Sequence, residues 1–173
     1  MRGPFLVRRA GLSKRQRHKG KAMSGETDLI KLYSARILAL AADMPRVGRL
    51  DAPSASVKKR APLCGSTVTV DINTDDQGRI TDYAQDVKAC ALGQAAASIV
   101  GANIIGLTRA EVTQARDALR HMLKDGGPVP PAPFDGLEVL QPARDYKNRH
   151  ASILLTLDAS VEALDELAKQ SCA

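Results

Sequence analysis

The sequence contains very few aromatic residues. Its 173 residues include two Phe, three Tyr and no Trp, although 44% of all residues are apolar. A hydrophobic core in this chain must therefore be aliphatic, built from Leu, Ile, Val and Ala. Proteins that bind single-stranded nucleic acid stack the bases on aromatic side chains. The shortage of aromatic residues therefore argues against a nucleic-acid partner.

Long apolar runs and paired cysteines are also missing. No run of 18 apolar residues occurs, so we expect no membrane-spanning helix. Three cysteines without a Cys-x-x-Cys pair do not make a disulfide framework, and they favour a reducing compartment. We therefore expect a cytoplasmic protein. A phosphate loop, a dinucleotide fingerprint and a Ser/His/Asp arrangement are all missing, so we expect no enzymatic activity.

The basic charge is confined to one end of the chain. The net charge is +6, but residues 1–22 hold eight Lys or Arg and no acid, which leaves the rest at −2. We expect residues 1–24 to be a basic disordered tail or an upstream extension, and residues 25–173 to be one domain. The tail could also target an organelle, since transit peptides are basic and poor in acids. We favour an extension, because the run that begins at Met23 is typical of a chain start.

Hydrophobic periodicity predicts one helix, a small antiparallel sheet and then several helices. The predicted helices cover residues 27–43, 90–105, 108–124, 134–140 and 145–168, the last with a break near Asp158. The spacing from Thr108 to Glu111 predicts a capping box at the start of the third helix. The predicted strands cover residues 55–59, 66–72 and 79–88, and the last two form a hairpin. This order is typical of an α+β fold in which several helices pack against a three-stranded antiparallel sheet.

Two cysteines stand at positions that suit metal binding. Cys64 lies in a loop between Pro62 and Gly65, and a flexible loop near the surface suits a ligand that must release its metal. Cys90 begins a predicted helix, where the macrodipole and the free N–H groups favour a thiolate. The alternative for both is a small apolar residue, at a strand start for Cys64 and among alanines for Cys90.

The order of three local motifs resembles the IscU/NifU amino-terminal family of iron–sulfur cluster scaffolds, over about residues 31–169. The family has a Pro-x-Cys-Gly-Asp loop, a cysteine before a helix of small residues, and a His-Cys-Ser or Arg-x-x-Cys motif at the start of its last helix. The matching segments here are Pro62-Leu63-Cys64-Gly65-Ser66, Cys90 with the alanines after it, and Arg149-His150-Ala151-Ser152. The spacing Tyr146-x-x-Arg149 is similar to the SufU branch.

The resemblance implies a scaffold or carrier without catalytic turnover. It implies that Cys64, Cys90 and His150 bind iron or a [2Fe–2S] cluster, with zinc as the alternative metal. It also implies a cysteine desulfurase and acceptor apoproteins as partners, and it leaves a homodimer open. We expect residues 25–173 to form this NifU-like scaffold domain.

Two positions depart from the family pattern. Ser66 replaces the aspartate that lines the cluster in the family, and the third cysteine is missing. Its position is Ala151 if the motif is read as His-Cys-Ser, and Ser152 if it is read as Arg-x-x-Cys. We prefer the first, because His150 and Ser152 then both match. A fourth ligand would have to come from a partner, a second subunit, a thiol such as glutathione, or water.

The departures leave two alternative functions open. One is a scaffold-derived interaction or regulatory protein that binds no cluster, which Ser66 and Ala151 favour. The other is a zinc protein that accepts sulfur.

Overall fold

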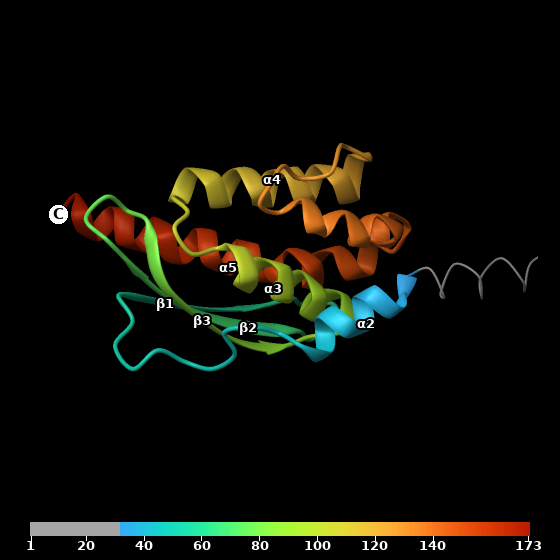
Figure 1. Ribbon diagram of the computed structural model, residues 1–173, viewed down its shortest axis with the longest axis horizontal. Coiled ribbons are helices and arrows are strands. Elements are labelled where there is room, and N and C mark those ends of the chain that lie inside the picture. The colour runs from blue at the N-terminus through green and yellow to red at the C-terminus, as the bar shows by residue number, and fades with distance from the viewer. Residues whose placement is uncertain (1–31) are drawn as a thin grey trace, which may run out of the picture.

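The computed structural model describes residues 32–173, so the predicted tail at residues 1–24 and the start of the first predicted helix lie outside the described residues. In chain order the described elements are α2 (Ala35–Ala42), β1 (Ala55–Arg60), β2 (Thr67–Thr74), β3 (Ile80–Lys88), α3 (Ala91–Asn103), α4 (Arg109–Asp125), the 3₁₀ helix η1 (Asp135–Asp145) and α5 (Lys147–Ser171). Each element overlaps a predicted segment, and the predicted α+β fold is confirmed (Figure 1).

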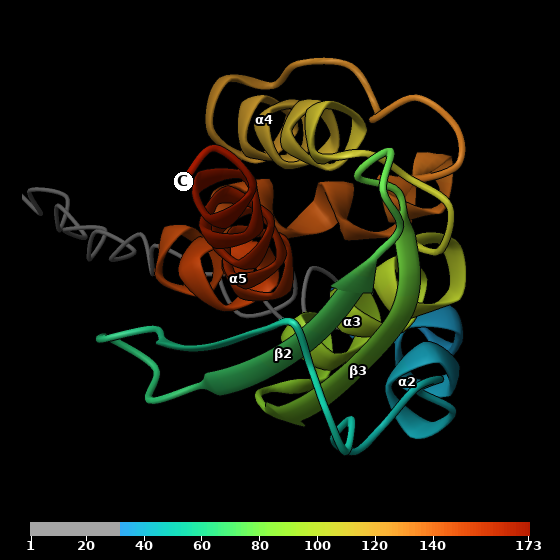
Figure 2. The same cartoon turned by 90° about the vertical axis from the view of Figure 1, so that its left-hand side faces the viewer.

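The sheet is a three-stranded antiparallel meander in the order β1-β2-β3. Val57 pairs with Val70, which in turn pairs with Gln85, so these residues share one row across the sheet. The alternating apolar residues of β2 point to one face of the sheet, and the helices cover that face (Figure 2). The sheet is therefore buried on one side, as its alternating sequence predicts.

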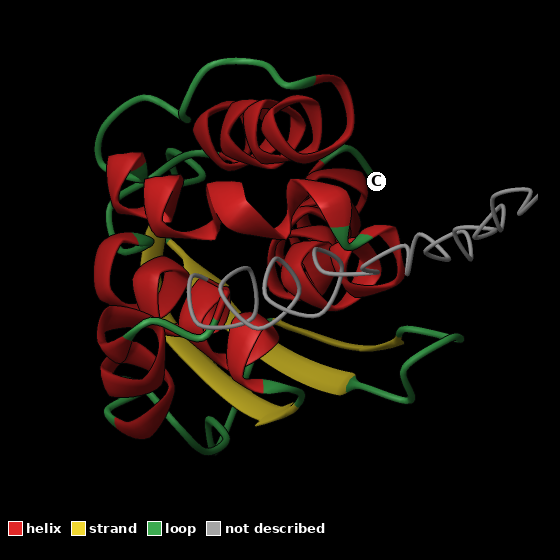
Figure 3. Ribbon diagram, turned by 90° about the vertical axis from the view of Figure 1, so that its right-hand side faces the viewer, coloured by secondary structure: helices red, strands yellow, loops and turns green. Residues whose placement is uncertain are grey.

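The helices form two layers over the sheet. Helices α3 and α5 pack directly on the strands, while α4 and η1 lie outside them (Figures 1 and 3). Helix α5 is unbroken over 25 residues, so the predicted break near Asp158 is wrong. An aspartate inside a helix is tolerated when its carboxylate has a partner, and Asp158 pairs with Arg120 of α4 at 3.1 Å.

The core is aliphatic, as the composition predicts. The largest fully buried side chains are mostly Leu and Ile, and Phe134 is the one aromatic residue among them. The predicted capping box of α4 is also confirmed, with the Thr108 amide donating to Glu111 at 2.7 Å. Within the part of the chain that the structure describes, no helix is long and apolar enough to cross a membrane.

The sheet register brings the predicted site residues to one end of the molecule. Arg60, Thr67 and Lys88 lie in one row across the sheet. Cys64 lies in the loop that joins β1 to β2, and Cys90 follows β3 by two residues. Both cysteines therefore lie beyond the same edge row, although they are 26 residues apart in the chain.

Candidate metal centre

Four side chains from three parts of the fold form a continuous polar group, the Cys/Ser cluster of Cys64, Ser66, Ser152 and Cys90. The sulfur of Cys64 lies 3.4 Å from Ser66 Oγ, and Ser66 Oγ lies 2.9 Å from Ser152 Oγ. Ser152 Oγ in turn lies 3.5 Å from Cys90 Sγ. The β1–β2 loop, the start of α3 and the first turns of α5 therefore meet through these four atoms.

The β1–β2 loop holds Cys64 in a tight turn. The amide of Gly65 donates to the carbonyl of Ala61 at 3.0 Å, and the amide of Ala61 donates to the carbonyl of Ser66 at 2.8 Å. Gly65 has a φ of +69°, a conformation that residues with a Cβ rarely adopt. The turn leaves Cys64 half-buried and exposes 83% of Leu63, so the sulfur lies near the surface.

Cys90 occupies the N-cap position of α3. Its backbone is extended, its side chain makes no capping hydrogen bond, and it is half-buried. The N-terminal turn of a helix presents unpaired N–H groups and a partial positive charge. An anionic cargo beside this helix end is therefore electrostatically favoured.

Ser152 reaches the cluster because Gly93 lets two helices approach closely. A Cβ on Gly93 would lie 2.6 Å from Ser152 Oγ and 3.0 Å from Ser152 O, both shorter than a normal contact. Helix α3 therefore needs glycine here for α5 to pack against it. Ser152 is 1% exposed and Ser66 is 4% exposed, so the two hydroxyls form the buried floor between the sulfurs.

The cluster favours ionisation of Cys64. Burial by itself would raise the pKa of this thiol, but hydrogen bonds from the hydroxyl and amide of Ser66 and from the hydroxyl of Ser152 outweigh it. The net result is a Cys64 pKa below its ordinary value. The thiolate is the form that binds metals and attacks electrophiles, so this cysteine is prepared for either role.

The structure places Ser152, and not Ala151, beside Cys90. Ala151 instead lines a separate cleft together with His150 and Leu154. The third cysteine of the family falls at Ala151, in the cleft, if the motif is read as His-Cys-Ser, and at Ser152, beside Cys90, if it is read as Arg-x-x-Cys. The preferred first reading stays a prediction. Ser66, the other expected departure, lies between Cys64 and Ser152.

His150 is buried near the start of α5 and held by backbone carbonyls of η1. Its Nε2 lies 3.0 Å from the carbonyl oxygens of both Ala143 and Arg144. Carbonyl oxygens only accept hydrogen bonds, so Nε2 carries the hydrogen and Nδ1 is the ring atom left for a ligand. Among residues 32–173, no three His, Cys, Asp or Glu side chains are placed to share one metal ion. Metal binding by His150 stays a prediction.

The donor set of the cluster is two thiols and two hydroxyls. Iron–sulfur clusters are held mainly by thiolates, and a serine hydroxyl is a much weaker ligand. The remaining cysteine of the sequence, Cys172, lies exposed in the last residues of the chain. It is about 30 Å along α5 from Ser152, too far to belong to the cluster. Among the described residues, the centre therefore brings together two thiols that could bind a metal, those of Cys64 and Cys90.

Comparison with known proteins places these residues within one family. The family of NifU-like N terminal domains matches residues 32–152, a range that includes all four residues of the cluster. A nitrogen-fixing NifU-like protein (N-terminal) from Brucella abortus has a similar crystal structure, with 45% sequence identity and a TM-score of 0.80. The match covers 82% of this chain and 98% of that chain.

A second solved structure shares the fold at lower identity. It is a putative iron–sulfur cluster assembly scaffold protein for the SUF system from the thermophile Fervidobacterium islandicum AW-1. Its identity is 21% and its TM-score is 0.71, over 78% of this chain and 98% of that chain. No curated protein matches the sequence.

Proposed function

Because this chain belongs to the family of NifU-like N-terminal domains, we propose that it is a scaffold or carrier for iron–sulfur cluster assembly. Cys64 and Cys90 hold iron or a [2Fe–2S] cluster as cargo. The observation that carries the proposal is that both sulfurs reach the same buried hydroxyl pair from different elements.

The geometry suits a cargo that must be handed on. Cys64 stands on a surface loop next to the exposed Leu63, so an acceptor protein can reach its sulfur. Two protein thiolates hold a cluster less tightly than four, and the remaining ligands are exchangeable. A cysteine desulfurase and acceptor apoproteins are the proposed partners, on the strength of the family.

Ser66 and Ser152 act as hydrogen-bond donors in this proposal. The Ser66 hydroxyl lies within hydrogen-bonding distance of the Cys64 sulfur, and the Ser152 hydroxyl within that of the Cys90 sulfur. Each hydroxyl donates its one hydrogen to a single acceptor at a time, and a sulfur that accepts it is stabilised as a thiolate. They therefore prepare the sulfurs to bind metal without ligating it themselves. His150, if its ring turns away from the carbonyls of Ala143 and Arg144, supplies a third ligand through nitrogen.

One observation favours a second function, that of an interaction protein without cargo. The 2.9 Å contact between Ser66 and Ser152 joins the β1–β2 loop directly to α5. By the resemblance, Ser66 stands where the family has a carboxylate, and Ser152 stands where it has a thiol if the motif is read as Arg-x-x-Cys. On this alternative the fold binds the partners of a scaffold and regulates them without a cluster.

Anaerobic reconstitution with iron, sulfide and a cysteine desulfurase separates the candidates. A visible chromophore with bound iron, lost in Cys64→Ala and Cys90→Ala but kept in the matched control Cys172→Ala, would support the scaffold. A folded protein with neither chromophore nor metal would support the interaction protein. Stoichiometric zinc without a chromophore would indicate a zinc-dependent sulfur acceptor, which is the remaining alternative.

A further inference from the structure

A basic cleft lies beside the Cys/Ser cluster, between the second half of α4 and the first half of α5. Its volume is about 510 Å³, which is within the range of small-molecule sites. Ala151 and Leu154 give its wall an apolar part, and the basic residues in the wall are Arg120, Lys124 and Lys147.

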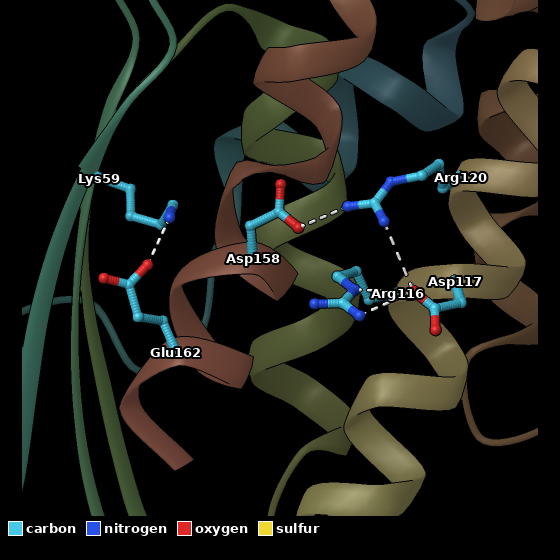
Figure 4. Close-up of polar contacts among 6 residues, drawn as sticks. All are labelled: Lys59, Arg116, Asp117, Arg120, Asp158 and Glu162. Carbon is cyan, nitrogen blue, oxygen red and sulfur yellow. Dashed lines mark hydrogen bonds and ion pairs between the residues drawn. The ribbon is translucent and has the colours of Figure 1, made fainter. Parts of the chain in front are cut away.

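The cleft carries excess positive charge. Asp158 is the only acid in its wall, and its carboxylate is paired with Arg120 at 3.1 Å, as Figure 4 shows. Arg120 also lies 3.6 Å from Asp117. Lys124 and Lys147 form no ion pair with any of the described residues. The two lysines are therefore available to an anionic ligand.

The acids Asp117, Asp158 and Glu162 near the cleft are paired with other cations. Burial raises the pKa of the Asp158 carboxyl, and the nearby charges of Arg120, Arg116 and Lys59 offset this only in part, so the net shift is upward. Lys59 of β1 is itself paired with Glu162 of α5, and Arg116 with Asp117 (Figure 4). These three acids are thus paired with cations other than Lys124 and Lys147.

The cleft and the candidate metal centre share one turn of α5. Ala151 lines the cleft, and the next residue, Ser152, contacts Cys90. Consecutive Cα atoms are about 3.8 Å apart. His150 also lines the cleft, and its ring is buried and fixed by the carbonyls of Ala143 and Arg144. Successive side chains of a helix point about 100° apart, so a ligand anchored in the cleft has to extend around α5 to bring its far end to the sulfurs.

Given the proposed scaffold function, we infer that the basic cleft binds a small peptide thiol with free carboxylates, of the glutathione class. Its carboxylates pair with Lys124 and Lys147, and its stem packs on Leu154. Its thiol loses its proton to solvent as the sulfur binds iron of the cargo. The peptide thiol thus supplies one of the ligands that the chain lacks, since serines stand at two of its four cluster positions.

Binding can be measured without any metal. Isothermal titration calorimetry of the metal-free full chain would use S-methylglutathione, which keeps both carboxylates but cannot ligate iron. The double variant Lys124→Glu/Lys147→Glu should bind at least about tenfold more weakly, because two attractive charges become repulsive. Asp158→Asn should bind more tightly. The matched control Lys169→Glu, an exposed lysine outside the cleft wall, should bind as the unchanged protein does.

Two results would overturn the inference. One is the absence of S-methylglutathione binding, and the other is equal binding of citrate, which would show an unselective anion site. A second measurement separates this inference from the scaffold function. Cluster reconstitution would be compared in glutathione and in the uncharged thiol 2-mercaptoethanol. If an iron–sulfur cluster forms equally in both thiols, the inference about the cleft is overturned and the scaffold function stands. If S-methylglutathione binds but no iron–sulfur cluster forms in either thiol, the peptide-binding cleft is supported and the scaffold function is overturned.

Discussion

The hydroxyl of Ser152 lies 3.5 Å from the sulfur of Cys90, at the point where α5 crosses the start of α3. Replacing that oxygen by sulfur would place a third thiol in the cluster without adding a heavy atom. We expect Ser152→Cys to retain more iron after anaerobic reconstitution and to lose its chromophore more slowly during incubation with a chelator. Visible absorption and iron analysis would measure both quantities.

Ala151→Cys is the matched control for this prediction, because it adds a thiol one residue earlier on the same helix. Its side chain would lie in the wall of the basic cleft, so we expect no slower chromophore loss than in the unchanged protein. If Ala151→Cys stabilised the chromophore and Ser152→Cys did not, the His-Cys-Ser alignment would be correct and the assignment of Ser152 to the cluster would fail.

Ser66 sets the acidity of Cys64. Its hydroxyl and amide are among the hydrogen-bond donors that hold the pKa of the Cys64 thiol below the ordinary value. We expect Ser66→Ala to raise this pKa, so a smaller fraction of Cys64 is ionised near neutral pH and alkylation by iodoacetamide becomes slower. The rate measured against pH, with mass-spectrometric assignment to Cys64, checks the direction of the shift. An unchanged midpoint would show that the Ser152 hydroxyl and the backbone are sufficient.

Local sequence patterns predicted most of the fold. The alternation of Val68, Val70 and Ile72 predicted a half-buried strand, and the spacing of Thr108 and Glu111 predicted a capping box. These features depend on neighbours within a few residues along the chain, which is the range that periodicity and capping rules describe.

The arrangement of side chains in the candidate metal centre depends on contacts between residues that are far apart in the sequence. Local sequence patterns do not describe such contacts. The rotation of α5 against α3 determines which of Ala151 and Ser152 faces Cys90, and the close contact at Gly93 places Ser152 there. The predicted break at Asp158 failed for a related reason, because its partner Arg120 comes from another helix. Neither the contact of Ser152 with Gly93 nor the pairing of Asp158 with Arg120 can be identified from local periodicity.

Gly93 is therefore expected to be essential to the packing of the cluster. Gly93→Ala would place a Cβ 2.6 Å from Ser152 Oγ and 3.0 Å from a backbone oxygen, so α5 must move away. We expect a loss of about 1–3 kcal/mol in the free energy of unfolding, measured by urea denaturation, together with weaker iron retention. Gly136→Ala is the control, since its Cβ would meet Ile99 at an ordinary 3.7 Å. Equal stability of the two variants would contradict the close-packing account.

Asp71 anchors the loop before β1 to the open face of the sheet. Its side chain is fully buried, and it accepts hydrogen bonds from Arg49 Nε at 2.6 Å and from the amide of Leu50 at 3.0 Å. Burial alone would raise the pKa of this carboxyl, but the hydrogen bonds from Arg49, Ser56 and Leu50 outweigh it and lower the pKa. The carboxylate thus contributes stability above the pKa it has in the unfolded chain, and that stability is lost as the pH falls through its folded pKa.

Arg49→Ala leaves this buried carboxylate without its cation. We expect a loss of about 2 kcal/mol in the free energy of unfolding at neutral pH, because Asp71 keeps the amide of Leu50 but loses two guanidinium hydrogen bonds. The loss should shrink in acid, where Asp71 is protonated and the missing cation no longer matters. Urea denaturation of both proteins between pH 3 and pH 7 measures this difference, with Arg79→Ala as an exposed control. A difference that stays constant over this range would show that Arg49 stabilises the loop by packing and not through its charge.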